Sequence, residues 1–274
     1  MKVISIIRNL GPGLLYAGAA VGVSHLVQST RAGASYGFGL LGVLILANIL
    51  KYPFFEFAPR YAASTGKSLV YGYRKIGNWA LILYALLTLS TMFIITGAIS
   101  MVTAGLLGSL LGLTLDIKWM TMGIMVLILL FLIIGKFRLL EKGMKYIIFV
   151  LTVTTIFAVA LSFKTELAGS YHFDWTNAID IAFLIAFVGW MPAPIDISVW
   201  HSTWTEAKYA DGIEKPSLKN AIKDFNIGYI GTAFLAIGFL ALGAFVMYGS
   251  GQEFSGKGVA FAGQLVSMYT ASLG

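Results

Sequence analysis

The sequence comprises 274 residues, of which 58% are hydrophobic and only 11% are charged, and its mean hydropathy is +0.84. Soluble domains usually carry about 25% charged residues, so most of this chain cannot face water. The formal net charge of +7 does not point to nucleic acid, because in so apolar a chain the basic residues report membrane orientation. The absence of cysteine excludes a disulfide framework and a thiolate metal cluster. We therefore expect an integral membrane protein that is surrounded by a lipid bilayer and has no nucleic-acid partner.

About seven stretches are long and apolar enough to cross a bilayer, for which a helix needs roughly 20 residues. Short polar segments separate them, so we predict an all-α membrane bundle without a large soluble domain. An amphipathic segment, residues 259–269, follows the last stretch. The expected spans are residues 10–30, 38–57, 79–111, 119–135, 146–163, 179–200 and 225–248.

The basic residues are distributed unequally between the two ends of these spans. With the N-terminus in the cytoplasm, fourteen of the nineteen lysines and arginines lie on the cytoplasmic side and four on the other, and Lys51 lies within a span. An excess of Lys and Arg marks cytoplasmic loops, so we predict a cytoplasmic N-terminus and a membrane of the bacterial inner (plasma) type. The expected cytoplasmic loops are residues 60–75, 136–145 and 208–223.

Two of the expected spans, and only two, carry helix-breaking residues in their middles. The first span contains Gly22 and Ser24. The sixth contains Pro192 and Pro194, a single residue apart. Proline removes an amide donor and clashes with the preceding turn, and in lipid the freed carbonyl groups need other partners. Interrupted helices at corresponding positions of two halves indicate a transporter binding site, whereas the alternative is that both are kinks that only aid packing.

Short motifs spread over nearly the whole chain carry a family likeness. They are Gly11-Pro12-Gly13-Leu14-Leu15, Arg31-Ala32-Gly33-Ala34, Ala63-Ser64-Thr65-Gly66-Lys67-Ser68-Leu69, Leu140-Glu141-Lys142, Met191-Pro192 and Phe261-Ala262-Gly263-Gln264-Leu265. In these motifs the chain resembles the Nramp divalent-metal transporters of the LeuT-fold superfamily. The resemblance implies an inverted-repeat helical bundle in which the first and sixth spans are broken.

The resemblance also implies a division of the chain into two related parts. Residues 1–164 would form a first repeat of five spans. Residues 165–274 would form an incomplete second repeat, with spans six and seven and the segment before span eight. Two such repeats need about ten spans, so we expect the natural gene to continue past Gly274 with further hydrophobic segments.

A metal site is implied by the same resemblance. The family's first-span motif, DPGN, whose Asp and Asn ligate the ion, falls on Gly22-Val23-Ser24-His25, so Gly22 stands in place of the Asp and His25 in place of the Asn. The sixth-span MPH motif is Met191-Pro192-Ala193 here, which keeps the thioether and lacks the histidine. The candidate substrate-binding positions are therefore Gly22, His25 and Met191, together with Val188 just before the second interruption.

Asp196, just after the second interruption, is a further candidate. A carboxylate at membrane depth is costly and is usually functional or paired. It could supply the negative charge that a divalent cation needs and that Gly22 does not provide. Alternatively, it forms a structural ion pair with Lys51. Asp196, Lys51 and His25 are also the candidates for proton coupling.

Several side chains have more ordinary interpretations. Met191 is a soft ligand that favours transition metals, although methionine more often fills a core. We expect a structural role for His201 and an ion pair between Glu56 and Arg60 at the i,i+4 helical spacing.

No phosphate-binding glycine loop, catalytic triad or zinc-type cluster appears in the sequence, so we expect neither an enzyme nor a cofactor. The first hypothesis is a secondary transporter that moves a divalent metal cation by alternating access, with proton coupling through the residues named above. The second is a LeuT-fold transporter of a non-metal small solute, held by the ends of the half-helices. The third is a non-transporting membrane sensor on the same fold. The sequence does not determine the oligomeric state.

Overall fold

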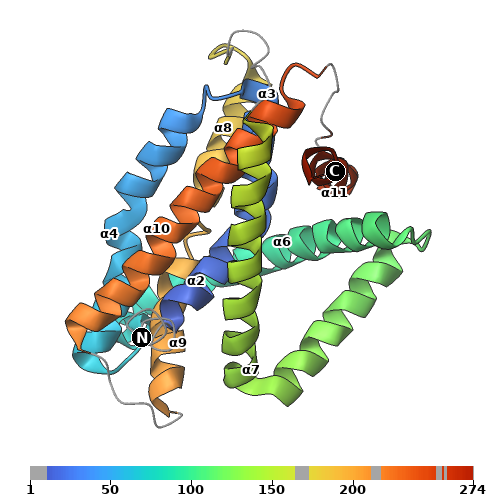
Figure 1. Ribbon diagram of the computed structural model, residues 1–274. Helices are drawn as coiled ribbons and strands as arrows, with labels where there is room; N and C mark the ends of the chain where they lie inside the picture. The colour runs from blue at the N-terminus through green and yellow to red at the C-terminus, as the bar shows by residue number, and fades with distance from the viewer. Residues whose placement is uncertain (1–10, 164–172, 211–216, 251–254, 256–257, 274) are drawn as a thin grey trace, which may run out of the picture.

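The computed structural model describes residues 11–163, 173–210, 217–250, 255 and 258–273 (Figure 1). All regular structure in these residues is helical, which confirms the all-α prediction for this part of the chain. The segments η1 and η2 are π-helical, with wider turns than an α-helix. In chain order the elements are α2 (Pro12–Ala20), η1 (Val21–Ser29), α3 (Thr30–Tyr36), α4 (Leu41–Thr65), α5 (Leu69–Ile76), α6 (Asn78–Leu111), α7 (Ile117–Ser162), α8 (Ala178–Trp190), α9 (Ile197–Ala210), α10 (Leu218–Leu242), η2 (Gly243–Met247) and α11 (Gly258–Leu273).

Five helical stretches in the described residues are long and apolar enough to cross a membrane. They correspond to the expected spans two, three, four, five and seven, and they lie in α4, in α6, in the two parts of α7, and in α10 continued by η2. The apolar helix α8 is shorter, with 13 residues. Spans one and six are not among the five because each is divided into shorter helices where the sequence predicts an interruption.

The fourth and fifth spans differ from the expectation. The sequence predicts a polar loop at residues 136–145, but the backbone stays helical there, and α7 is one helix of 46 residues. The loop prediction is wrong because this basic stretch contains no proline and carries an ion pair that suits a helix, with Lys145 Nζ 2.9 Å from the Glu141 carboxylate one turn earlier. Figure 1 shows α7 turning sharply at its lower end, so its two parts still run in different directions.

The second span corrects another expectation. Pro53 and Pro59 lie inside α4, so the first and sixth spans are not the only ones that contain helix breakers, yet α4 is helical from Leu41 to Thr65. A single proline removes one helical hydrogen bond, and the helix absorbs the loss as a bend. Pro192 and Pro194 instead remove two donors within one turn. Closely spaced prolines, and not prolines alone, predict a full interruption.

The helix α10 lies at the centre of the bundle, against α2, α3, α4 and α7 (Figure 1). Two close backbone approaches place the first span directly on it. A Cβ atom at Gly13 would overlap the backbone of Asp224, and a Cβ atom at Gly33 would overlap the backbone of Leu240. We call these contacts the first and second glycine seams. They lie on either side of the interruption in the first span.

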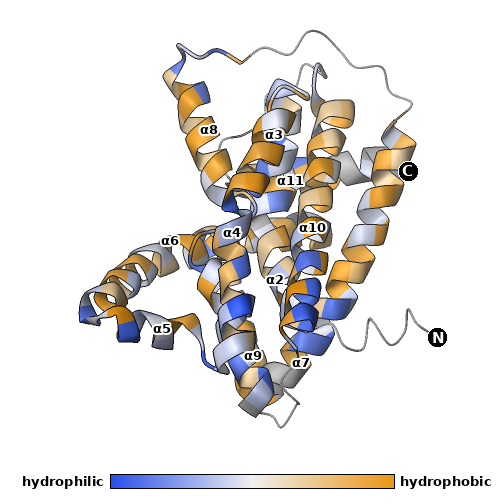
Figure 2. Cartoon of the chain, turned by 90° about the vertical axis from the view of Figure 1, so that its left-hand side faces the viewer, coloured by the Kyte–Doolittle hydropathy of each residue, from blue (hydrophilic) through white to orange (hydrophobic). Residues whose placement is uncertain are grey.

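Several of the expected cytoplasmic segments meet at one end of the bundle, which we call the basic end. Lys208 Nζ, in α9, lies 3.3 Å from the Glu141 carboxylate in α7. The Asp224 carboxylate, in α10, accepts hydrogen bonds from the backbone N–H groups of Gly11 at 3.1 Å and Gly13 at 2.8 Å. Figure 2 shows hydrophilic residues gathered at the lower ends of α9 and α10. Polar contacts therefore join α2, α7, α9 and α10 at this end of the bundle.

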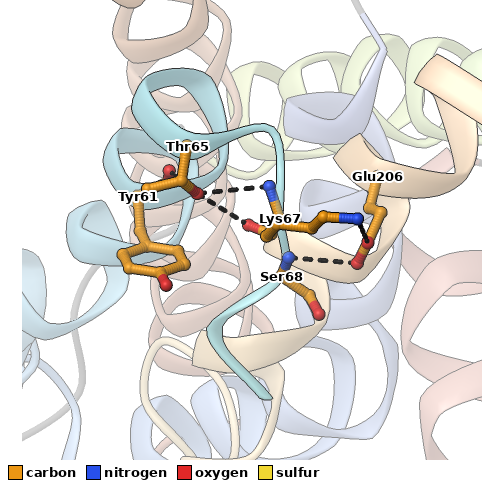
Figure 3. A network of polar contacts seen from close by, with 5 residues as sticks. All are labelled: Tyr61, Thr65, Lys67, Ser68 and Glu206. Atoms are coloured by element: carbon orange, nitrogen blue, oxygen red, sulfur yellow. Dashed lines mark hydrogen bonds and ion pairs between the residues drawn. The ribbon is translucent and has the colours of Figure 1, made fainter. Parts of the chain in front are cut away.

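The loop after α4 belongs to the same end (Figure 3). Gly66 ends α4 in the left-handed conformation, with φ of 74°. Thr65 Oγ1 then accepts a hydrogen bond from the Lys67 amide at 3.2 Å. The Glu206 carboxylate of α9 accepts one from the Ser68 amide at 3.0 Å and lies 4.0 Å from Lys67 Nζ. This loop, one of the motifs that carry the family likeness, therefore ties α4 to α9.

The opposite end is held by aromatic and polar contacts. The Tyr36 hydroxyl, at the end of α3, donates a hydrogen bond to Asp180 in α8 at 2.9 Å. The Arg31 guanidinium lies over the rings of Phe183 and Phe261, 5.5 and 5.8 Å from their centroids. The first span is thus joined to α8 and α11 at this end as well as to α10.

The helix α6 and the first part of α7 form an arm that leaves the bundle (Figure 1). Its large apolar side chains are mostly exposed: Phe93, Ile94 and Ile134 expose 72%, 73% and 77% of their surface. Their backbone hydrogen bonds are satisfied within the helices, as a lipid environment demands. The arm therefore has the surface of membrane-embedded helices.

Candidate transport site at the two interrupted helices

The first interruption lies at Gly22, the second residue of η1. Gly22 has φ of −59° and ψ of −129°, outside the helical range, and the wide turns of η1 follow. Gly22 is the one residue of η1 with dihedral angles outside the helical range, so the interruption is confined to Gly22 and does not extend to Ser24 as the sequence predicts. The reason is local, because the Ser24 hydroxyl donates to the Ala20 carbonyl and holds the next turn in place.

His25 also turns back to the same carbonyl. Its Nδ1 atom lies 2.6 Å from the Ala20 oxygen and 3.0 Å from Ser24 Oγ. A hydrogen bond to a carbonyl requires Nδ1 to carry the proton, which leaves Nε2 with a free lone pair in the neutral ring. The side chain is buried, and Nε2 has no hydrogen-bond partner. His25 is therefore a buried imidazole that is held by the Ala20 carbonyl and lies close to the Thr232 backbone in α10.

The resemblance implies that Gly22 stands where the family has its acidic ligand. It is exposed, and a Cβ atom built on it would meet no atom within 4 Å. The backbone thus leaves room for a side chain at this point. The chain places no carboxylate there.

The second interruption separates α8 from α9. It runs from Met191 to Asp196 and contains a cis peptide bond between Met191 and Pro192. In a continuous helix the residue at position 192 would donate to the Val188 carbonyl and the residue at 194 to the Trp190 carbonyl. Proline at both positions removes these donors. The end of α8 therefore has carbonyl groups that need partners from elsewhere.

Lys51 of α4 provides that partner. Its ammonium donates hydrogen bonds to the carbonyl oxygens of Val188 at 2.5 Å, Met191 at 2.7 Å and Gly189 at 3.3 Å. The negative end of the α8 dipole favours a cation at this place. No ion pair joins Lys51 to Asp196 in the described residues, so the expected structural pair between them is not formed.

Asp196 lies directly before the first turn of α9 and is almost fully buried, with 4% of its surface exposed. Its Oδ1 atom has no hydrogen-bond partner, and no ion pair in the described residues involves it. The N-terminus of α9 favours a negative charge at this position. A buried carboxylate oxygen without a partner is costly, which marks Asp196 as a group that has capacity for a ligand.

A cavity of about 610 Å³ lies beside the second interruption. It is lined mainly by apolar side chains of α4, α6, α8 and the interruption, with Lys51 and Thr91 as its polar members. Met191, Asp196 and His25 are buried and do not line it. The cavity therefore gives access to the carbonyl groups at the end of α8 and not to the other candidate ligands.

The two interruptions meet in the core. Ser29 Oγ, at the end of η1, lies 3.6 Å from Met191 Sδ. Ala20, just before the first interruption, packs in one cluster with Ala193 and Ile197 around the second. The structure thus brings Lys51, Val188, Met191 and Ser29 together. It joins neither His25 nor Asp196 to them by a hydrogen bond or ion pair, and the described residues contain no group of three His, Asp or Glu side chains that could hold a metal.

The expected ion pair is formed, His201 packs in the core, and one participant was missed. Arg60 Nη2 lies 2.6 Å from Glu56, and the buried ring of His201 packs edge-on against Phe225 at 5.7 Å. The sequence did not single out Ser29. Its position two turns after Gly22 in a span with few polar side chains was the available signal.

These features define a class: a helical membrane protein of several spans in which two helices are interrupted where they meet. The profile of the Nramp family, described as Natural resistance-associated macrophage protein-like, matches residues 13–270. The chain therefore belongs to the Nramp family, as its motifs indicate, and the family implies a fold of the LeuT type. A protein of Pasteurella multocida (strain Pm70), named only as uncharacterized, is 38% identical over 271 residues, which cover 97% of this chain. The chain spans 62% of the length of that relative.

Proposed function

We propose that this protein is a secondary transporter that moves a cation across the membrane by alternating access. The observation that carries the proposal is the meeting of two interrupted helices, in which Ser29 Oγ lies 3.6 Å from Met191 Sδ and Ala20 shares a cluster with Ala193. Paired interruptions place free backbone groups at the depth where transporters bind their substrates. Membership of the Nramp family supports a cation as the substrate.

A divalent metal ion is the first candidate substrate. An uncompensated divalent charge in a low-dielectric region is very costly, so the site needs a carboxylate, and Asp196 is the acidic residue next to the second interruption. Its buried Oδ1 without a partner supports this role. Met191 would add a soft ligand that favours a transition metal.

A small non-metal solute is the second candidate, and one observation favours it. The Lys51 ammonium is already bound at the end of α8, while Gly22 supplies no carboxylate at the first interruption. In this alternative the half-helix ends hold a polar solute, and Asp196 does not ligate a metal.

Three further assignments belong to the proposal. The basic end faces the cytoplasm, because it contains most of the Lys and Arg residues. Residues 1–164 form the first repeat, and residues 165–274 begin the second. Asp196, His25 and Lys51 are the groups through which protons couple to transport.

The first prediction tests whether the protein transports a divalent metal ion. The protein is reconstituted in liposomes that contain a metal-sensitive dye, and uptake of Mn²⁺, Co²⁺ and Mg²⁺ is followed. We expect Asp196→Asn to abolish uptake of all three ions while the fold stays intact. Met191→Ala should reduce uptake of Mn²⁺ and Co²⁺ more than that of Mg²⁺, because it removes the soft ligand.

The matched control is Glu56→Gln, since Glu56 pairs with Arg60 and belongs to neither interruption. Uptake that survives in Asp196→Asn would show that the compensating charge lies elsewhere. If the unaltered protein neither binds nor moves any divalent ion, but is thermally stabilised by a non-metal solute, the second candidate is correct.

A further inference from the structure

Lys51, in α4, donates hydrogen bonds to the carbonyl groups at the second interruption. Its ammonium has three N–H donors, and three backbone carbonyls accept from it: those of Val188 at 2.5 Å, Met191 at 2.7 Å and Gly189 at 3.3 Å. We call these three carbonyls the carbonyl cradle. The cradle satisfies the full hydrogen-bonding capacity of one primary ammonium.

The cradle has the chemistry of a binding site for a small cation. Its oxygens converge on one point, and the C-terminal end of α8 adds the negative end of a helix dipole. Pro192 guarantees that the Val188 carbonyl is not consumed by the helix, because it has no amide hydrogen. No carboxylate lies within ion-pair distance of Lys51 in the described residues. Backbone groups alone therefore compensate the ammonium.

A cavity next to the carbonyl cradle has room for the Lys51 ammonium. Its side chain is only partly buried, and it lines the cavity of about 610 Å³ beside the interruption. The other polar member of the lining is Thr91 of α6. An ammonium that leaves the cradle can therefore enter the cavity without displacing packed core residues.

We propose that the carbonyl cradle is a cation-binding subsite that the chain fills with its own Lys51 ammonium. A primary ammonium or a similarly small monovalent cation binds there when Lys51 is removed or displaced. The consequence for transport rests on the proposed function: an entering cation competes with Lys51, and the loss of Lys51 from the cradle removes its hydrogen bonds between α4 and the end of α8. The subsite itself does not depend on which substrate is moved.

The test is chemical rescue in the purified chain. Lys51→Ala removes the ammonium and leaves the cradle, and thermal unfolding is followed as methylammonium chloride is added. We expect saturable stabilisation, with a rise in Tm of roughly 4 °C near saturation. Tetramethylammonium, which has the same charge and no N–H donor, should have no such effect at equal ionic strength. The unaltered chain and Lys118→Ala, which removes an exposed lysine at the start of α7, should show no saturable response.

A second variant covers the case in which Lys51→Ala does not fold. The chain contains no cysteine, so Lys51→Cys can be modified uniquely, in membranes, with aminoethyl or trimethylammonioethyl methanethiosulfonate. The aminoethyl product restores an ammonium near the cradle and should restore a monodisperse protein. The trimethylammonium product should not, and reduction of the disulfide should reverse the rescue.

The proposal is overturned if a folded Lys51→Ala shows no saturable response to methylammonium, or if tetramethylammonium acts equally. It is also overturned if neither methylammonium nor aminoethylation rescues variants that fail to fold. These outcomes are separate from those of the uptake experiment. Metal uptake that depends on Asp196, without rescue at position 51, would leave the proposed function intact and refute the subsite.

Discussion

The two interrupted helices satisfy their free carbonyl groups in opposite ways. At the first interruption, Ser24 and His25 both turn back to the Ala20 carbonyl one turn earlier. At the second, Lys51 crosses from α4 to carbonyls of Val188 and Met191, which are more than a hundred residues away in the chain. The hydrogen bonds of Ser24 and His25 to Ala20 join groups of one segment, whereas those of Lys51 join two helices.

This difference determines which interruption loses hydrogen bonds when the helices move relative to one another. Hydrogen bonds whose donor and acceptor belong to one segment persist when the surrounding helices move. An interruption satisfied by another helix loses its partner when the two helices separate. The second interruption is therefore the place where a movement of α4 against α8 changes the chemistry of the site.

The largest effect is expected from a substitution of Lys51, which removes the hydrogen bonds between α4 and the second interruption. Lys51→Met keeps the length of the side chain and removes the ammonium, so the carbonyls of Val188 and Met191 lose a charged donor. We expect a loss of about 3 kcal/mol in the free energy of unfolding, measured by thermal or chemical denaturation in detergent. Lys118→Met is the control and should be nearly neutral. Equal stability of the two variants would mean that water replaces Lys51 without cost.

A second change would make the first interruption depend on a ligand. Gly22→Asp places a carboxylate where a Cβ atom meets nothing within 4 Å. We expect the variant to gain stabilisation by Mn²⁺, of about 2.7 kcal/mol when the free ion exceeds its Kd a hundredfold. Gly42→Asp in α4 also adds a carboxylate in open space but lies at neither interruption, so it should not respond. The same response in both variants would indicate nonspecific binding of the ion.

The smallest effect is expected from substitutions of Ser24 and His25, which test how the first interruption is stabilised. Because Ser24 and His25 share the Ala20 carbonyl, either can replace the other. Ser24→Ala and His25→Phe should each cost about 0.5–1 kcal/mol, and the double variant should exceed their sum by about 1 kcal/mol. A double-mutant cycle in thermal unfolding measures this coupling. Strict additivity would show that the two groups act independently.

The interruptions themselves were predictable because their causes are local. Pro192 and Pro194 lack amide donors whatever surrounds them, and Gly22 lies in a short polar stretch of an otherwise apolar span. The same local reasoning failed for residues 136–145, where polar composition indicated a loop. Charge marks exposure to water, but it does not end a helix when proline is absent and a Glu141–Lys145 pair supports the turn.

The partners of the candidate residues were harder to predict. The sequence offered Asp196 as a partner for Lys51, because a carboxylate is the usual counter-charge of a buried ammonium. The structure gives Lys51 backbone carbonyls instead. Every residue has a carbonyl group, so only the three-dimensional arrangement of α4 and α8 determines which ones are reached. The same holds for the Asp224 contacts with Gly11 and Gly13.

The two glycine seams restrict how the first span can move. Gly13 holds α2 on the start of α10, Gly33 holds α3 near its end, and Gly22 lies between them. Because both contacts are made with one continuous helix, the angle at Gly22 cannot change while both seams persist. A swing of α2 away from the basic end must therefore break the hydrogen bonds from Gly11 and Gly13 to Asp224. In such a swing the first span pivots at Gly22, while Gly33 keeps α3 attached to α10.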